Sequence, residues 1–218
     1  MSRSGTEVAA AAAIGFERLG GDQAGAILDE LSALYQEVYA EPPYQWGPEH
    51  LSAFQQRFEE RRRQPGLTLI TARVSGELLA YTFGMPLKPT TAWWQNLLEP
   101  LPDEVTREWD GRTFAIVELL VRAPWRRQHI GQRLHDLLLQ DRTEERATLT
   151  VLPTAEAARA AYDKWGWQRV ALKRSPLPEG PVFEVRVRPL TYRHGDERQP
   201  GEPHVVWRRG THAIFKEP

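Results

Sequence analysis

The sequence contains no cysteine, no long apolar run and no excess of either charge. The absence of cysteine excludes disulfides, thiolate zinc sites and a cysteine nucleophile, and it suits a reducing compartment. No apolar segment approaches the roughly 18 residues of a membrane span. Because 28 basic residues balance 29 acidic ones, no overall field attracts nucleic acid or an anionic membrane. We therefore expect a cytoplasmic protein that binds neither.

The length and composition indicate one compact domain. The chain has 218 residues, of which 41% are hydrophobic, enough for one sizeable core. We place this domain at residues 12–190, after an N-terminal extension at residues 1–11. Residues 191–218 are polar and rich in glycine and proline, which predicts a tail or an added edge strand.

The first half of the domain combines helical and strand patterns. Apolar residues recur at helical spacing from Ala24 to Val38, and the prolines of "AEPPY" end this helix. A second helix begins at Pro48. The segments "LTLITARV" and "LLAYTFGM" flank a short turn and predict an antiparallel hairpin. Residues 86–111 are expected to be irregular.

The second half alternates strands and helices. "FAIVELLV" is apolar on both faces, as in a central strand, and a helix is predicted from Arg127 to about Glu145. "ATLTVL" predicts a strand, "PTAEAARAAYDKWG" a helix, and "WQRVAL" and "PVFEVRVRPL" two closing strands. This order predicts an α/β (α+β) fold whose mostly antiparallel sheet contains one strand-helix-strand crossover.

The corner "APWRRQHIGQRL" after the central strand has the features of an anion site. Backbone N–H groups in the first turn of a helix lack partners and carry partial positive charge. Arg126 and Arg127 add full charges, and Gly131 permits close approach of a ligand. These features favour a pyrophosphate at residues 127–132, although the arginines could instead simply cap and solvate the helix end.

Two motifs carry a family resemblance. "LLVRAPWRRQHIGQRL" resembles the acetyl-CoA signature of the GNAT N-acetyltransferases, with Arg126 and Gly131 at its ends. "AARAAYDKWGWQRV" is similar to that family's second hallmark, which here contains Tyr162. The resemblance implies the GNAT fold, with a splayed pair of parallel central strands flanked by helices, and an enzyme that uses acetyl-CoA.

The sequence departs from the family pattern at two positions. His129 stands where a glycine is usual, so a side chain enters the phosphate loop. Ala155 replaces a frequent asparagine, which removes a polar contact to the pantetheine arm. We expect these two departures to reduce the affinity for the cofactor but not to change which cofactor is bound.

The resemblance also implies a cofactor site. Backbone groups of Leu119, Leu120 and Val121 would pair with the pantetheine as a strand would, and a backbone N–H near Leu120 would stabilise the oxyanion. The diphosphate would lie on Arg126, Arg127, Gln128, His129, Ile130, Gly131 and Gln132.

Two side chains are candidates for proton transfer in a direct reaction without a covalent enzyme intermediate. Glu118 is the only charge within "FAIVELLV", and a buried carboxylate is costly unless it is paired or used. It is the expected base, with a salt bridge to Arg122 or to another arginine as the alternative. By resemblance Tyr162 is the general acid at the cofactor sulfur, whereas its helical periodicity alone would make it a core aromatic.

The acceptor pocket, by resemblance, is walled by "YAEPPYQWG" and "TTAWWQNLLEP". Glu41 could hold a cationic amine, and aromatic rings could form an apolar surface. Packing under long loops is the alternative for these rings. The predicted substrate-binding set is Glu41, Tyr44, Trp46, Trp93 and Trp94.

The predicted function is acetyl transfer from acetyl-CoA to an amine, with a small molecule favoured over a peptide. Two alternatives remain open, namely a non-catalytic acyl-CoA-binding protein and a transferase with a longer acyl donor or a hydroxyl acceptor. The expected partners are the amine and, as an open alternative, a second copy of the chain. The six histidines show no metal-ligand spacing, so no metal is expected.

Overall fold

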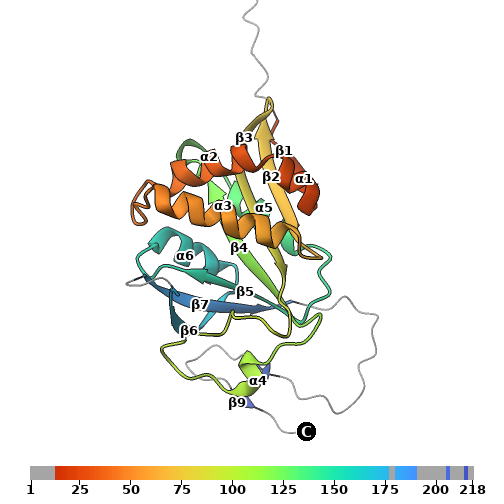
Figure 1. Ribbon diagram of the computed structural model, residues 1–218, viewed down its shortest axis with the longest axis vertical. Helices are drawn as coiled ribbons and strands as arrows, with labels where there is room; N and C mark the ends of the chain where they lie inside the picture. Colours follow the sequence, from red (N-terminus) through yellow and green to blue (C-terminus); the bar gives the residue numbers. More distant parts are fainter. Residues whose placement is uncertain (1–12, 177–179, 191–204, 207–213, 216–218) are drawn as a thin grey trace, which may run out of the picture.

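The computed structural model describes residues 13–176, 180–190, 205–206 and 214–215, and its centre is a seven-stranded sheet (Figure 1). The strand order is β1-β2-β3-β4-β5-β7-β6, and of these pairs only β4 with β5 is parallel. This arrangement confirms the predicted sheet and its single crossover. The strands are β1 (Gly15–Leu19), β2 (Thr68–Val74), β3 (Glu77–Pro86), β4 (Thr113–Val121), β5 (Arg146–Val151), β6 (Gln168–Arg174) and β7 (Val182–Pro189).

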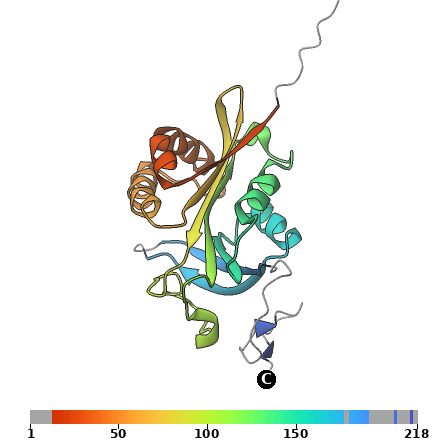
Figure 2. The same cartoon turned by 90° about the vertical axis from the view of Figure 1, so that its right-hand side faces the viewer.

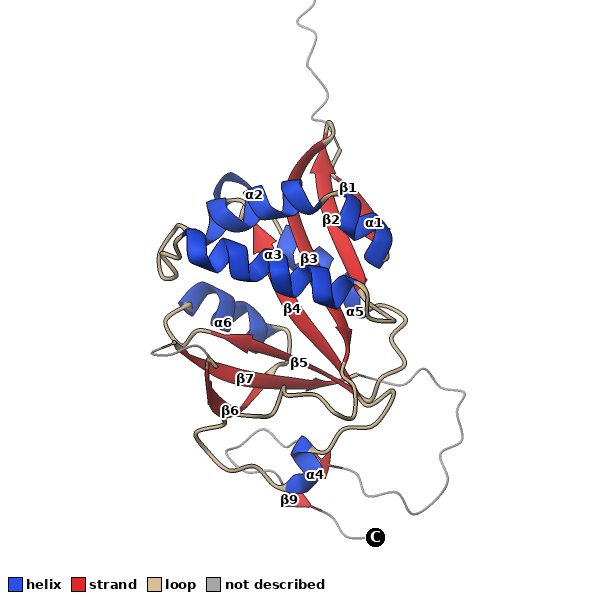
Figure 3. Ribbon diagram, viewed as in Figure 1, coloured by secondary structure: helices blue, strands red, loops and turns tan. Residues whose placement is uncertain are grey.

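Helices cover both faces of the sheet, as the view from the side makes clear (Figure 2). On one face lie α1 (Gly21–Ala26), α2 (Leu28–Tyr39) and α3 (Pro48–Arg62). The opposite face carries α5 (Ile130–Leu139) and α6 (Glu156–Lys164). The short α4 (Asp103–Thr106) lies in the connection between β3 and β4, at one end of the molecule (Figure 3).

Each helical layer buries its own apolar cluster against the sheet. Phe54 and Phe58 of α3 are 2% and 0% exposed, as the helical spacing predicts, and they pack with Tyr35 and Phe83. On the other face, Leu134 of α5 is fully buried among residues of the central strands. Burial of these apolar surfaces is the main favourable contribution to folding.

The predicted helix from Ala24 to Val38 is broken at Ile27. Its apolar face continues across the break, because Ala24 and Leu31 are both fully buried. However, Ile27 has a non-helical ψ of 20°, and its N–H donates to Ala24, three residues earlier. The two glycines within α1 are poor helix formers, so the chain forms two helices instead of one.

The predicted helix from Arg127 to about Glu145 is shorter at both ends. Arg127 and His129 adopt left-handed backbone conformations, with φ of 62° and 61°, which an α-helix does not allow. At the other end Gln140 is extended. The helix therefore spans only Ile130–Leu139, and the residues before it form an irregular loop.

The irregular segment between β3 and β4 is held to the rest of the fold by a buried polar network. Glu108 accepts hydrogen bonds from the Trp94 indole and the Thr113 hydroxyl at 2.8 and 2.9 Å, and it forms an ion pair with Arg146 at 2.8 Å. Earlier in the same segment, the N–H of Leu98 donates to the carbonyl of Leu172 on the outer edge of β6. The segment therefore covers that edge.

Part of the C-terminal prediction lies outside the described residues. The described pieces are β8 (Val205–Val206) and β9 (Ile214–Phe215), which pair with each other and not with the seven-stranded sheet. Within the described ranges, none of the helices has the length and hydropathy needed to cross a membrane.

Gly84 of β3 packs directly against β4, and this close approach generates a prediction. A Cβ atom at Gly84 would overlap the carbonyl oxygen of Ala115 and lie 2.5 Å from a ring carbon of Phe114. Gly84→Ala is therefore expected to lower the free energy of unfolding by about 1–3 kcal/mol, as overpacking does. Urea denaturation measures this change. Gly15→Ala is the control, because its Cβ would have only an ordinary contact at 3.9 Å; equal effects would contradict the prediction.

Candidate active site

The parallel strands β4 and β5 separate after a short ladder and leave a cavity between them. Only three residue pairs join the strands, from Thr113 with Arg146 to Ala115 with Thr148. Beyond these pairs the strands diverge (Figures 1 and 3). A cavity of about 600 Å³ lies there, lined by β4, β5, α6, the loop before α5 and the segment after α2. We call it the splay cavity.

A β-bulge in β4 directs Glu118 toward α2. The register with β3 shifts between Phe83, which pairs with Glu118, and Gly84, which pairs with Ile116, so Val117 has no partner. Val117 packs with the cluster under α2 and α3, and the Glu118 side chain contacts Tyr39 of α2. Two consecutive residues thus face the same helical layer, which a regular strand does not permit.

Beyond the bulge, one backbone edge of β4 has no partner among the described strands. Leu119, Leu120 and Val121 pair with β3 on one side, but β5 has already diverged on the other. All three residues line the splay cavity, and the carbonyl of Val121 accepts a hydrogen bond from Arg126 at 3.0 Å. An extended ligand could pair with this free edge as an additional strand would.

The loop at the start of α5 presents a run of free backbone donors. Among the described residues, the N–H groups of residues 127 to 132 have no protein acceptor, and the helical ladder begins with Arg133 donating to His129. The left-handed Arg127 and His129 shape this loop, and both line the cavity. Successive free amides at a helix N-terminus form a strong anion site.

Gly131 of this loop lines the cavity and faces β4. A Cβ atom there would have only ordinary contacts, at 3.5 Å from Leu119 and 3.6 Å from Val121, so packing against β4 does not itself require glycine. The predicted phosphate-site residues do not all line the cavity. Gln128 donates to Pro124 at 3.1 Å, and Ile130 is buried in the core.

Glu118 is a carboxyl group in an apolar, aromatic setting within the cavity. It accepts a hydrogen bond of 2.6 Å from the Tyr39 hydroxyl. Burial raises the pKa of Glu118 to about 7, and the Tyr39 hydrogen bond and the charges of Arg61 and Arg57 only partly oppose this rise. A carboxyl group with this pKa exchanges a proton readily near neutral pH. The alternative partner, Arg122, instead pairs with Glu37 and Glu77.

Tyr162 of α6 lines the same cavity. Its ring packs edge-on against Trp165 and Trp167, with centroid separations of 5.7 and 6.1 Å. Burial, and then the charges of Tyr44 and Glu118, raises its pKa, so the hydroxyl keeps its proton at neutral pH. Within the described ranges no protein group hydrogen-bonds this hydroxyl, which leaves it available to a ligand.

The predicted acceptor-binding residues are divided by the structure. Tyr44 lines the splay cavity. Trp46 does not, because it is stacked between Tyr39 and His50. Glu41 forms an ion pair with Arg126 at 2.6 Å, so the two residues expected at the acceptor and the cofactor bind each other.

The two tryptophans before the central strand lie elsewhere, which corrects their expected position. Trp94 is buried against Ala171, Val185 and Val187, and the Trp93 indole donates to Thr148 at 3.1 Å. They hold the long connection against the sheet instead of lining the cavity. Tyr39, the first residue of the predicted wall "YAEPPYQWG", was expected only as part of an aromatic surface, and the fold additionally places its hydroxyl on Glu118.

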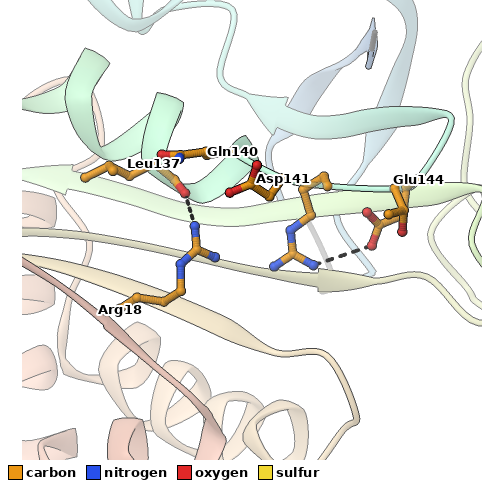
Figure 4. A pocket seen from close by; sticks show the side chains of 7 residues that line it. Arg18, Leu137, Gln140, Asp141 and Glu144 are labelled. Carbon is orange, nitrogen blue, oxygen red and sulfur yellow. Dashed lines mark hydrogen bonds and ion pairs between the residues drawn. The ribbon is translucent and has the colours of Figure 1, made fainter. Parts of the chain in front are cut away.

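A second hollow, of about 430 Å³, lies at the C-terminal end of α5 (Figure 4). Its charged groups are directed at the protein itself. Arg18 donates to the Leu137 carbonyl, and Arg142 reaches Glu144 at 3.5 Å and Thr68 at 2.6 Å. Because these contacts already use the guanidinium groups, the splay cavity is the candidate active site.

Comparison with known proteins agrees with this geometry. A family model described as the acetyltransferase (GNAT) family matches residues 31–167. No curated protein matches the sequence. Among solved structures, the ribosomal-protein-S18-alanine N-acetyltransferase of Escherichia coli superposes with a TM-score of 0.55 at 14% identity, covering 86% of this chain and 100% of that one.

Two further structures share the fold and were solved with ligands. An aminoglycoside 6'-N-acetyltransferase complexed with coenzyme A has a TM-score of 0.56 at 14% identity, over 83% of this chain and 99% of that one. The Arabidopsis thaliana NAA60 in complex with a bisubstrate analogue has a TM-score of 0.56 at 13% identity, over 81% and 98%. At these identities the likeness concerns the fold.

The hydrogen bond from Tyr39 generates a prediction about the carboxyl group of Glu118. Tyr39→Phe removes a donor that favours the carboxylate form, so the pKa of Glu118 is expected to rise above about 7. A carbon-13 NMR titration of the labelled glutamate carboxyl groups measures it. Tyr44→Phe is the control, because that hydroxyl does not hydrogen-bond Glu118. An unchanged pKa in Tyr39→Phe would contradict this account.

Proposed function

The chain belongs to the GNAT family of acetyltransferases, and from this premise we propose that it transfers the acetyl group of acetyl-CoA directly to the amine of a small molecule. The observation that carries the proposal is the splay cavity, in which free backbone donors, a carboxyl group with raised pKa and an unpaired phenol meet. The backbone donors suit an anionic ligand, and the carboxyl group and the phenol suit proton transfer.

The residues of the cavity fit coenzyme A. The free amides of residues 127–132 would bind the diphosphate, and the open edge of Leu119–Val121 would pair with the pantetheine amides. Arg126 would have to share or exchange its contact with Glu41. When bound, acetyl-CoA supplies the acetyl thioester that the amine attacks. The proposed donors to the developing oxyanion are the backbone N–H groups of Leu119 and Val121. The alternation of the β3–β4 ladder directs these two groups to the open side, since the N–H of Arg122 donates to Leu79 of β3.

Glu118 would take the proton that the amine loses. A primary amine is mostly charged at neutral pH and cannot attack until it is deprotonated. The Glu118 carboxylate, held by Tyr39, lies in the cavity and has a pKa near the working pH. Transfer directly or through one water would leave Glu118 protonated, and release to solvent would restore the carboxylate.

Tyr162 would return a proton to the leaving sulfur. Its hydroxyl stays protonated because its pKa is raised, and Trp165 and Trp167 fix its ring. Donation to a thiolate gives the free thiol, and the phenolate recovers its proton from solvent. The ammonium group loses two protons in all, one to Glu118 before the attack and a second to solvent from the nitrogen of the tetrahedral intermediate. The thiol gains one, so the balanced reaction releases one proton to solvent.

Tyr162→Phe tests this role. We expect turnover, measured as release of free coenzyme A, to fall by about 10²–10⁴-fold because the general acid is lost. Acetyl-CoA should still raise the melting temperature, since the phosphate loop is intact. Tyr35→Phe is the matched control, because Tyr35 does not line the splay cavity. Undiminished turnover in Tyr162→Phe would remove Tyr162 from the mechanism.

Glu118 gives a prediction about pH. The carboxylate is the active form, so kcat/KM is expected to fall as pH drops through about 7. Glu118→Gln should remove this limb of the profile and lower kcat/KM by about 10²–10⁴-fold. The profile is measured with two amines of different pKa, because only a limb belonging to the enzyme keeps its position. The assignment to Glu118 would be refuted if the fall in kcat/KM shifted with the pKa of the amine, or if it persisted in Glu118→Gln.

A further inference from the structure

Helix α6, which carries Tyr162, is held to the sheet with little apolar burial. None of its nine residues is buried, and Ala158 and Tyr162 are only partly buried where they pack against the core cluster on that face. The neighbouring helix α5, by contrast, buries Ile130, Leu134 and Leu138. Because apolar burial is the main force that packs a helix on a sheet, contacts of another kind are expected to fix α6.

An ion network between α6 and β7 provides these contacts. Arg186 of β7 is only 3% exposed, and its Nη1 lies 2.5 Å from Oδ1 of Asp163 on α6. Its Nε and Nη2 lie 2.8 and 2.7 Å from Oε2 of the buried Glu184. The other carboxylate oxygen of Glu184 lies 2.9 Å from Nε of Arg159, one turn before Asp163 on the helix. Two arginines and two carboxylates thus join the helix to the strand at two points.

The strand side of this network belongs to the same sheet face as the wall of the splay cavity. Arg186 is paired with Leu149 of β5, and Glu184 is paired with Val151. Directly paired residues of antiparallel strands lie on one face, and both Leu149 and Val151 line the cavity. The backbone there is also held, because the Thr148 hydroxyl donates to the Arg186 carbonyl at 3.0 Å.

Tyr162 lies between the two anchored residues of α6, Arg159 and Asp163. Within the described chain its hydroxyl has no protein hydrogen-bond partner, so the placement of α6 and the ring contacts with Trp165 and Trp167 determine where it lies. A tilt of the helix would move the hydroxyl, and a misplacement of about 1 Å can lower turnover about 10²-fold.

Stability alone does not account for this network. Taking charged groups out of water is costly, and replacing a buried ion pair with apolar residues is often neutral or stabilising. What the guanidinium group supplies is direction, because its planar fork binds carboxylates only in a defined orientation. Arg186 uses one side of this fork for Glu184 and the other for Asp163, which sets the position of the helix relative to the strand.

We propose that Arg186, through its bridge to Asp163, is a positioning residue that fixes α6 on the sheet and so keeps the Tyr162 hydroxyl in place in the splay cavity. Glu184 and Arg159 complete the anchor. This inference rests on the proposed function, because it concerns the placement of the general acid.

Asp163→Ala tests the bridge, since its side chain is 62% exposed and its removal leaves the core intact. We measure release of free coenzyme A from acetyl-CoA with ethanolamine, putrescine, histamine and D-glucosamine as acceptors. The expected result is a fall in kcat of about tenfold or more, with the KM for acetyl-CoA unchanged because its site is intact. Asp163→Asn, which keeps an oxygen acceptor for Arg186, should recover most of the loss.

Glu30→Ala is the matched control. It also removes an ion pair between a helix carboxylate and a strand arginine, to Arg73 at 2.7 Å, but neither residue lines the splay cavity. Its kcat should equal the wild-type value. A wild-type kcat in Asp163→Ala, or an equal loss in Glu30→Ala, overturns the inference.

A double-mutant cycle separates positioning of Tyr162 from a general structural role. If the bridge acts through Tyr162, then Asp163→Ala placed in the Tyr162→Phe background should lower kcat further by only about twofold or less. A loss that is repeated in full in that background would show that the bridge acts elsewhere, and it would overturn the inference.

Fluorine NMR gives a measurement that needs no amine. The protein is labelled with 3-fluorotyrosine at its six tyrosines, and the signal of Tyr162 is the one that Tyr162→Phe removes. We expect this signal to shift or broaden in Asp163→Ala and to stay unchanged in Glu30→Ala. An unchanged signal in Asp163→Ala overturns the inference even if no amine is turned over. Absence of turnover together with no melting shift on adding coenzyme A would instead overturn the proposed function.

Discussion

The separation of β4 from β5 is the constraint on which the site depends. Only three pairs hold the parallel strands together, and the bulge at Val117 then turns β4 away from a regular path. The same event frees one backbone edge, creates the cavity and places Glu118 on the α2 side. If the two strands stayed paired to their ends, the sheet would be more complete, but there would be no space for a ligand.

The sequence allowed the order of strands and helices to be predicted, because buried strands such as β4 and amphipathic helices such as α3 have clear apolar periods. It did not reveal the break at Ile27 or the late start of α5. Those features depend on backbone conformations such as φ of 61° at His129, for which the local sequence offers no glycine. The position of β7 between β5 and β6 is a tertiary pairing that local pattern does not encode.

The candidate site was predictable where chemistry stands out against its background. Glu118 is conspicuous as a charge in an apolar strand, and the corner at residues 126–132 as a basic turn. Aromatic residues gave no such contrast. Nothing in the local sequence distinguishes the four predicted aromatic residues, Tyr44, Trp46, Trp93 and Trp94. The fold places Tyr44 in the cavity and packs the three tryptophans elsewhere.

The contact of the long β3–β4 connection with β6 also affects how the sheet meets other molecules. Asn96 and Leu98 occupy backbone groups on the outer side of β6, so in the described part of the chain the opposite margin, β1, is the open one. That strand is only five residues long and carries Glu17 and Arg18. Short, charged edge strands discourage one sheet from adding to another. The covered edge at β6 and the short, charged edge at β1 therefore both disfavour aggregation through strand pairing.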